Sequence, residues 1–196
     1  MTVMKRGITQ LLATILLLCS IVLFLLLSIK TTILFSNFTP EQQNAVNYLQ
    51  GRDELLGDYT EAERAHMHDV QQLFKKGNAL FLMLSGAFIL LFSLFHEKRA
   101  EIKKIIFFSG ILITSIVILI LILLLLSFNT SFIFFHTIFF PQGNWQFPVD
   151  SLLIQIFPLE FFTKMSFLIF SQALGWGILF ILISLYFKYA DQKRQS

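Results

Sequence analysis

The sequence predicts an all-α membrane protein with four transmembrane helices and a small extracellular cap of short amphipathic helices and interfacial loops. Hydrophobic residues make up 56% of the 196 positions and charged residues only 14%, and the mean hydropathy is +0.72. A soluble core of this size does not absorb that many apolar side chains. The apolar residues instead gather in four stretches long enough to cross a bilayer core about 30 Å thick.

The four predicted spans alternate with loops along the chain. Transmembrane helices are expected over residues 1–30, 79–95, 105–128 and 165–187, extracellular cap regions over 31–78 and 129–164, a cytoplasmic loop over 96–104 and a cytoplasmic tail over 188–196. The first span has the basic start of a signal peptide. Its apolar run exceeds the length of about 7 to 15 residues typical of such peptides, and no small-residue cleavage site follows. We therefore expect it to be retained.

The distribution of Lys and Arg predicts the orientation of the chain, because cations near helix ends are retained on the cytoplasmic side. The two termini and the loop 96–104 hold nine cations against three acidic residues, a net charge of +6, whereas the two long loops hold six against nine, a net charge of −3. Both termini are therefore expected inside and both long loops outside. The pI of about 9.1 reflects this asymmetry, so the sequence predicts no nucleic-acid partner.

The first cap region carries two signals for helix starts. Thr39–Gln42 combines an N-cap threonine, a proline at the first helical position and a glutamine at the third, and Gly51 is suited to end that helix. Thr60–Glu63 is a second capping box, and it opens a helix that contains His66. We expect a kink or a break where this helix meets residues 75–78 ahead of the second span.

The second of these helices carries a histidine on an apolar side. At about 100° per residue, His66 shares one side with Val70, whereas His68 points nearly the opposite way. Glu63 and Asp69 lie three residues before and after His66, on neighbouring turns. Either carboxylate is therefore expected to accept the ring N–H of His66 and orient it.

The second cap region is apolar but interrupted. Residues 131–162 are rich in phenylalanine, yet Pro141, Pro148 and Pro158 break the run. A fifth span would need unbroken backbone hydrogen bonding in lipid, so a segment lying at the membrane interface is expected instead. His136 lies within this aromatic stretch, on the same outer side as His66.

The two outer histidines are the candidate catalytic residues, because an ionisable group in apolar surroundings is costly and is usually paired or functional. A zinc site is disfavoured, since the i,i+2 spacing of His66 and His68 splays their rings on a helix. A serine hydrolase is disfavoured too, because the chain lacks a Gly-x-Ser-x-Gly elbow. We predict neither a metal nor a cofactor. The residues alone leave open a non-enzymatic protein whose cap binds lipid or a partner protein, and a metal-dependent membrane hydrolase.

Several motifs follow one another in a recognisable order. They are Tyr48-Leu49-x-Gly51, Glu63-x-x-His66-Met67-x-Asp69-Val70, Phe135-His136-x-x-Phe139-Phe140 with Gly143-x-Trp145-x-Phe147, and Phe157-Pro158-x-x-Phe161-Phe162. In this order, set among four spans, they resemble the bacterial lipoprotein intramolecular transacylases, and the match covers nearly the whole chain. The resemblance implies four transmembrane helices under an extracellular cap in a bacterial cell membrane. It also implies diacylglyceryl-modified lipoproteins as substrate.

The resemblance further implies a reaction and its residues. The sn-2 acyl chain of a diacylglyceryl-cysteine lipoprotein would move to the α-amino group of its own N-terminal cysteine and leave a lyso-form lipoprotein, with His66 and His136 as catalytic residues. Imidazole, with a pKa of about 6.5, is matched to an amine with a pKa of about 7.7 to 8.0, so general acid/base catalysis without a covalent intermediate is expected.

The surroundings of the two histidines are expected to form the substrate pocket. The ester and the amine already belong to one substrate molecule, so the main tasks of the site are to orient these two groups and to exclude water. Asn144, Tyr48 or backbone amides are candidate donors to the oxyanion. The predicted pocket residues are Tyr48, Phe135, Phe139, Phe140, Asn144, Trp145 and Phe147, with Glu63 and Asp69 as orienting residues. A monomer among membrane lipids is expected.

Overall fold

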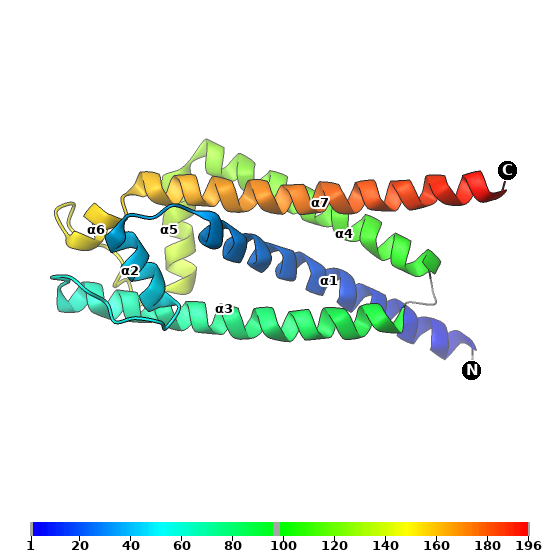
Figure 1. Cartoon of the computed structure of the whole chain (residues 1–196), viewed down its shortest axis with the longest axis horizontal. Helices are drawn as coiled ribbons and strands as arrows, with labels where there is room; N and C mark the ends of the chain where they lie inside the picture. The colour runs from blue at the N-terminus through cyan, green and yellow to red at the C-terminus, as the bar shows by residue number, and fades with distance from the viewer. Residues whose placement is uncertain (1, 96–98, 196) are drawn as a thin grey trace. The chain divides into compact units, whose positions relative to one another are not determined.

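The computed structural model describes residues 2–95 and 99–195. Within these residues the chain is helical and contains no strand, which confirms the predicted all-α fold (Figure 1). The helices are α1 (Thr2–Phe35), α2 (Pro40–Leu49), α3 (Glu61–Leu94), α4 (Arg99–Leu126), α5 (Phe128–Phe139), α6 (Leu152–Ile156) and α7 (Leu159–Gln195).

The chain divides into two compact units. The first unit comprises the chain up to Thr31, Phe81–Leu121 and the chain from Ile169 onward, and the second comprises Thr32–Leu80 and Ile122–Leu168. The long helices α1, α3, α4 and α7 contribute residues to both units, whereas α2, α5 and α6 belong wholly to the second. Both candidate histidines belong to the second unit.

Among the described residues, four helices are long and apolar enough to cross a membrane, namely Gln10–Phe35, Glu61–Leu94, Ala100–Leu126 and Leu159–Lys193. They carry the apolar runs from which the spans are predicted. In α3 the first turns hold charged residues at several positions up to Lys76, and the uncharged apolar run begins only after Asn78. His66 therefore precedes the uncharged apolar run of α3 by more than three turns.

Two expectations about helix ends need correction. The break expected at residues 75–78 does not occur, because α3 runs without interruption from Glu61 to Leu94. One helical glycine costs only about 1 kcal/mol, which the flanking helix-forming residues offset. Of the loop expected at 96–104, residues 96–98 lie outside the described part of the chain, and the remainder is helical because α4 begins at Arg99.

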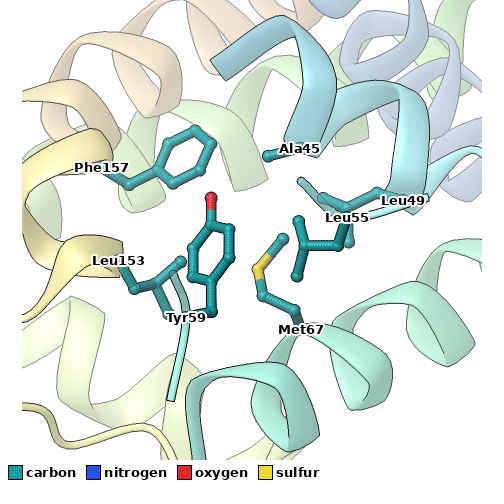
Figure 2. Packing of buried hydrophobic residues seen from close by; sticks show 7 residues of the cluster. All are labelled: Ala45, Leu49, Leu55, Tyr59, Met67, Leu153 and Phe157. Atoms are coloured by element: carbon teal, nitrogen blue, oxygen red, sulfur yellow. The ribbon is translucent and has the colours of Figure 1, made fainter. Parts of the chain in front are cut away.

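A hydrophobic core holds the second unit together (Figure 2). It joins α2, the segment between α2 and α3, the start of α3, and α6 with the residue that follows it. Its buried members are Ala45, Leu49, Leu55, Tyr59, Met67, Leu153 and Phe157. Both predicted capping boxes are present: Thr39 exchanges hydrogen bonds with Gln42, and Thr60 exchanges them with Glu63. Gly51 follows α2 with a φ of 72°, a conformation that glycine adopts without strain.

In the first unit, small residues bring α4 close to the helices beside it. The hydroxyl of Ser20 on α1 donates to that of Ser109 on α4 at 2.9 Å, and both residues are buried. A Cβ at Gly110 would lie 2.8 Å from the backbone oxygen of Gly177 and 2.9 Å from the backbone nitrogen of Ile181, both on α7. Close approach of this kind is the usual basis of helix association in lipid.

We expect Gly110→Ala to destabilise the protein by about 1–3 kcal/mol, because the added methyl group meets backbone atoms that cannot rotate away. Thermal unfolding in detergent, followed by circular dichroism, measures the effect as a lower Tm. Gly175→Ala is the matched control, since a Cβ there meets nothing within 4 Å. Equal Tm values for the two variants would show that α4 and α7 do not pack this closely.

Candidate active site

A buried carboxylate fixes the start of α3, one turn ahead of His66. The Oε2 atom of Glu63 accepts hydrogen bonds from the backbone nitrogen and the hydroxyl of Thr60, both at 2.8 Å. Its Oε1 atom accepts from the backbone nitrogen of Leu153 at 2.8 Å. The side chain is 1% exposed. Although burial raises the pKa of Glu63, these hydrogen bonds outweigh it and the pKa lies below the usual value. Glu63 therefore joins the start of α3 to α6, and it makes no hydrogen bond to His66.

The two candidate histidines lie against an aromatic wall formed by Phe140, Phe147 and Trp145, and His66 packs on the first two of these rings. The residue is 7% exposed, and the centre of its ring lies 4.9 Å from that of Phe140 and 5.7 Å from that of Phe147. The pKa of His66 is lowered from 6.5 to about 4, first by burial and then by the neighbouring His136, while Asp69 and the side chain of Asn144 act in the opposite direction. The imidazole is therefore neutral near pH 7.

The helix α5 presents the second histidine. Ser127 caps this helix by accepting from the backbone nitrogen of Thr130, and His136 lies near its end. The Nδ1 atom of His136 is 2.9 Å from the carbonyl oxygen of Phe132. A carbonyl only accepts, so Nδ1 carries the proton and Nε2 holds the lone pair of the neutral ring. Burial lowers the pKa of His136, against a smaller opposing effect of the Phe132 hydrogen bond.

The two imidazoles lie in one site, although 70 positions separate them in the chain. Their ring centres are 6.2 Å apart with an angle of 30° between the planes, and both residues are less than a tenth exposed. Phe140, which is 3% exposed, contacts both rings, at 4.9 Å from His66 and 5.7 Å from His136. Trp145 lies 4.8 Å from His136. The pair is thus enclosed by aromatic rings and held mostly away from water.

A tight turn after α5 adds a polar group to this wall. Gly143 has a φ of 77°, and its backbone nitrogen donates to the carbonyl oxygen of Phe140 at 3.1 Å. The Oδ2 atom of Asp69 accepts from the side-chain nitrogen of Asn144 at 2.6 Å and from that of Gln142 at 2.9 Å. The carboxylate of Asp69 therefore orients Asn144 by direct contact.

Two polar atoms of the site are buried without a hydrogen-bond partner among the described residues. They are Nδ1 of His66 and Oδ1 of Asn144. The two side chains are neighbours, and Asn144 raises the pKa of His66 as a hydrogen-bonding group, although the two buried atoms do not meet the geometry of a hydrogen bond to each other. A buried polar atom without a partner typically costs about 1–3 kcal/mol, and such atoms in native structures often mark a binding or catalytic role.

The remaining predicted pocket residues lie at different distances from the histidines. The ring centre of Phe135 lies 5.4 Å from that of His136 and 4.7 Å from that of Phe139, but both phenylalanines are about half exposed. Tyr48 packs on the core of the second unit, and its backbone oxygen accepts from Gln71 at 2.6 Å. Its place is in that core, and no ring contact joins it to either histidine.

Two residues beside the histidines are not predicted from the sequence. Phe132 contacts the ring of His136 at 4.0 Å and supplies the carbonyl that fixes its tautomer. The i−4 spacing on a helix is a signal that would have found it. Gln142 shares the Asp69 carboxylate with Asn144. No local spacing points to that pairing, because it joins positions 73 residues apart.

A metal site finds no support in the described part of the chain. No group of three or more His, Cys, Asp or Glu side chains there is arranged to hold an ion. His68 is exposed on the opposite side of α3 from His66, and its Nε2 atom lies 3.3 Å from the side-chain nitrogen of Gln72.

Comparisons with known proteins give a consistent result. The sequence model of the lipoprotein intramolecular transacylase family, Lit, matches residues 41–162. A solved structure of the membrane integral lipoprotein intramolecular transacylase Lit from Bacillus cereus aligns with a TM-score of 0.79 and 18% identity over 97% of this chain and 100% of that chain. No curated protein matches the chain.

Two further structures of the Bacillus cereus protein, in which one histidine is replaced by arginine or by alanine, have TM-scores of 0.77 and 0.78. They are 17% and 18% identical to this chain, cover 99% and 100% of it, and are themselves covered to 97% and 99%. At these identities the structural likeness shows a shared fold.

The lowered pKa values predict a loss of stability in mild acid. An unfolded histidine has a pKa of about 6.5, so between pH 6.5 and the folded values the unfolded chain binds more protons than the native one. Stability therefore decreases as the pH falls through this window. We expect a lower Tm at pH 5 than at pH 7, and a smaller difference for His66→Phe. His68→Phe, at an exposed position, keeps the full difference. An undiminished difference in His66→Phe would contradict the burial of a neutral ring.

Proposed function

The chain belongs to the lipoprotein intramolecular transacylase family, and from this premise we propose that it moves the sn-2 acyl chain of a diacylglyceryl-cysteine lipoprotein to the α-amino group of the same cysteine. The observation that carries the proposal is the pairing of two buried, neutral imidazoles at 6.2 Å in an aromatic site. The reaction is an acyl transfer within one substrate molecule. His66 and His136 are the proposed catalytic residues.

We assign both proton transfers to His136. Its Nδ1 proton is committed to the carbonyl oxygen of Phe132, which leaves the Nε2 lone pair to act as a base. The α-ammonium group of the substrate has a pKa of about 7.7 to 8.0. Near pH 7 a fraction of it therefore loses its proton to solvent and becomes the neutral amine. Nε2 then takes a proton from the amine nitrogen as that nitrogen bonds to the ester carbonyl carbon.

The second half of the reaction returns this proton. The tetrahedral intermediate breaks the bond between the carbonyl carbon and the sn-2 glyceryl oxygen, and the imidazolium of His136 gives its proton to that oxygen. The products are an N-acylated cysteine and a free sn-2 hydroxyl group. No acyl-enzyme forms, which agrees with the lack of a serine elbow in the sequence. Because burial disfavours imidazolium at both positions, one histidine acting as base and then as acid requires no resting charge in the site.

The aromatic wall supplies orientation and dryness. Because ester and amine already belong to one molecule, holding them in contact is able to contribute roughly 7–11 kcal/mol to lowering the barrier. Water that entered the site would attack the same carbonyl carbon and release a fatty acid. Phe140 is the ring best placed to prevent this, since it is buried and contacts both histidines.

We further propose the cellular arrangement of the reaction. The excess of Lys and Arg in the termini and the loop 96–104 supports cytoplasmic termini, with the site on the outer face of a bacterial cell membrane. The substrates would be diacylglyceryl-modified lipoproteins that reside in the same leaflet. A monomer suffices for this chemistry, because both histidines come from one chain.

Removal of either histidine tests the function. We expect His136→Ala to reduce conversion of a diacylated lipopeptide to its N-acylated lyso form by about 10²–10⁴-fold, the range typical of a lost general acid or base, and His66→Ala to reduce it as well because the second ring of the pair is lost. Mass spectrometry of the lipopeptide measures the conversion. His68→Ala removes an exposed ring and is expected to keep the wild-type rate. Wild-type conversion by both site variants would eliminate the histidine mechanism.

The water-excluding role of Phe140 has a separate readout. We expect Phe140→Ala to raise the ratio of released fatty acid to transferred acyl chain, because the truncation removes a buried ring that contacts both imidazoles and so admits water. The matched control is Phe134→Ala, on the same aromatic stretch but 67% exposed, which leaves the ratio unchanged. Quantifying free fatty acid and N-acyl lipopeptide from one reaction decides the outcome. An unchanged ratio in Phe140→Ala would assign water exclusion to other rings.

A further inference from the structure

The buried polar atoms left without partners in the site suit a ligand that donates hydrogen bonds. The carboxamide oxygen of Asn144 only accepts, and the Nδ1 atom of a neutral His66 accepts when the proton resides on its other nitrogen. Neither atom has a partner among the described residues. The Nε2 atom of His136 is a third acceptor, because the proton of that ring is held on Nδ1 by Phe132.

The orientation of Asn144 follows from its partner. Asp69 accepts from the side-chain nitrogen of Asn144 at 2.6 Å, and a carboxylate is able only to accept. A flipped carboxamide would set its oxygen against the carboxylate oxygen, so the nitrogen must face Asp69 and Oδ1 must face away. The positive φ of Gly143 permits the turn that brings Asn144 to this position.

The charge around this acceptor favours a cation. Asp69 is an acidic side chain that reaches the site through Asn144, and a hydrogen bond to a carboxylate polarises the amide so that its oxygen becomes a better acceptor. An oxyanion brought to the same place would face acceptor atoms and a carboxylate. The arrangement therefore argues against Asn144 as an oxyanion donor, a role for which the sequence made it a candidate.

We propose that Oδ1 of Asn144 and Nδ1 of His66 form a binding subsite for the α-amino group of the substrate's N-terminal residue, with Asp69 as the residue that positions Asn144. The inference rests on the proposed function for the identity of the amine. The substrate amine binds as ammonium before it loses the proton that leaves the attacking neutral amine, and in this form it has three N–H donors for three acceptors, the two subsite atoms and Nε2 of His136. The ring separation of 6.2 Å lies within the reach of one small group that hydrogen-bonds to both histidines at about 3 Å.

The subsite gives the reaction a direction. After transfer the nitrogen is a secondary amide with one N–H and no positive charge. It satisfies only one of the acceptors, so the others are again buried without partners. The N-acylated product is therefore held less tightly than the substrate at this position, and lipoproteins that are already N-acylated are poor ligands.

Binding of non-reacting analogues tests the subsite without catalysis. The probes are diether analogues of a diacylglyceryl-cysteine peptide, whose alkyl chains cannot be transferred, with a free, an N-acetylated or an N,N,N-trimethylated amino terminus. Binding to the full-length protein in detergent is measured by calorimetry. We expect the wild-type protein to bind the free-amine form at least about tenfold more tightly than either modified form. The trimethylated probe keeps the charge but has no N–H donor, so this series needs no variant protein.

The variant comparison isolates Asn144. Asn144→Leu keeps the approximate size but removes the acceptor, and we expect the preference for the free amine to fall by about tenfold. Gln155→Leu is the matched control, because it removes an exposed carboxamide of α6 that donates to the backbone oxygen of Asp150, and it keeps the preference.

Three outcomes would overturn the proposal. Equal binding of all three probes by the wild-type protein excludes an amine subsite, and tight binding of the trimethylated probe reduces it to general attraction of charge. A slower acyl transfer in Asn144→Leu with an undiminished amine preference would show that Asn144 acts only by holding the His66 ring. Failure of the proposed function has a different signature, namely no acyl transfer from an ester substrate while the amine preference persists.

Discussion

The buried carboxylate of Glu63 is the constraint on which the site depends. It accepts from Thr60 at the start of α3 and from the backbone nitrogen of Leu153 in α6, two segments 90 residues apart. A charged group that is 1% exposed is tolerated only when its oxygens are hydrogen-bonded, so loss of either contact would leave a costly unsatisfied group. This pairing sets the register of α3 relative to α6, and His66 follows one turn later. The core around Tyr59 and Met67 packs on the same junction.

The exclusion of water from the site determines the protonation state of the two histidines. Exposed imidazoles would be partly protonated near neutral pH, whereas burial against Phe140, Phe147 and Trp145 keeps both rings neutral. The same rings that exclude water from the histidines would exclude it from an ester bound beside them. The proposed acid/base function and the proposed protection from hydrolysis thus share one physical cause, the removal of solvent by aromatic side chains. The carbonyl of Phe132 completes the arrangement by selecting the tautomer of His136.

The two acidic residues near His66, Glu63 and Asp69, have different hydrogen-bond partners, which their charge alone does not indicate. The carboxylate of Glu63 accepts a hydrogen bond from the backbone nitrogen of Leu153, whereas that of Asp69 accepts from the side chains of Asn144 and Gln142. Neither carboxylate hydrogen-bonds an imidazole, so neither supplies the strong bias toward imidazolium that a direct ion pair would give. Asp69 instead acts through a neutral amide. This indirect arrangement is compatible with rings that remain neutral yet lie near a negative charge.

Local composition and periodicity are sufficient to predict several features of this protein. Uncharged apolar runs required helices that cross a membrane, the boxes at Thr39 and Thr60 started α2 and α3, and helical spacing separated buried His66 from exposed His68. The pairs of distant groups that meet depend on the packing of the whole second unit: His66 with His136, Glu63 with Leu153, and Asp69 with Asn144. The spacing of a carboxylate on a helix lists the partners within its reach but does not choose among them. That choice depends on which buried N–H groups the packing of other segments leaves without an acceptor, and no local pattern contains this information.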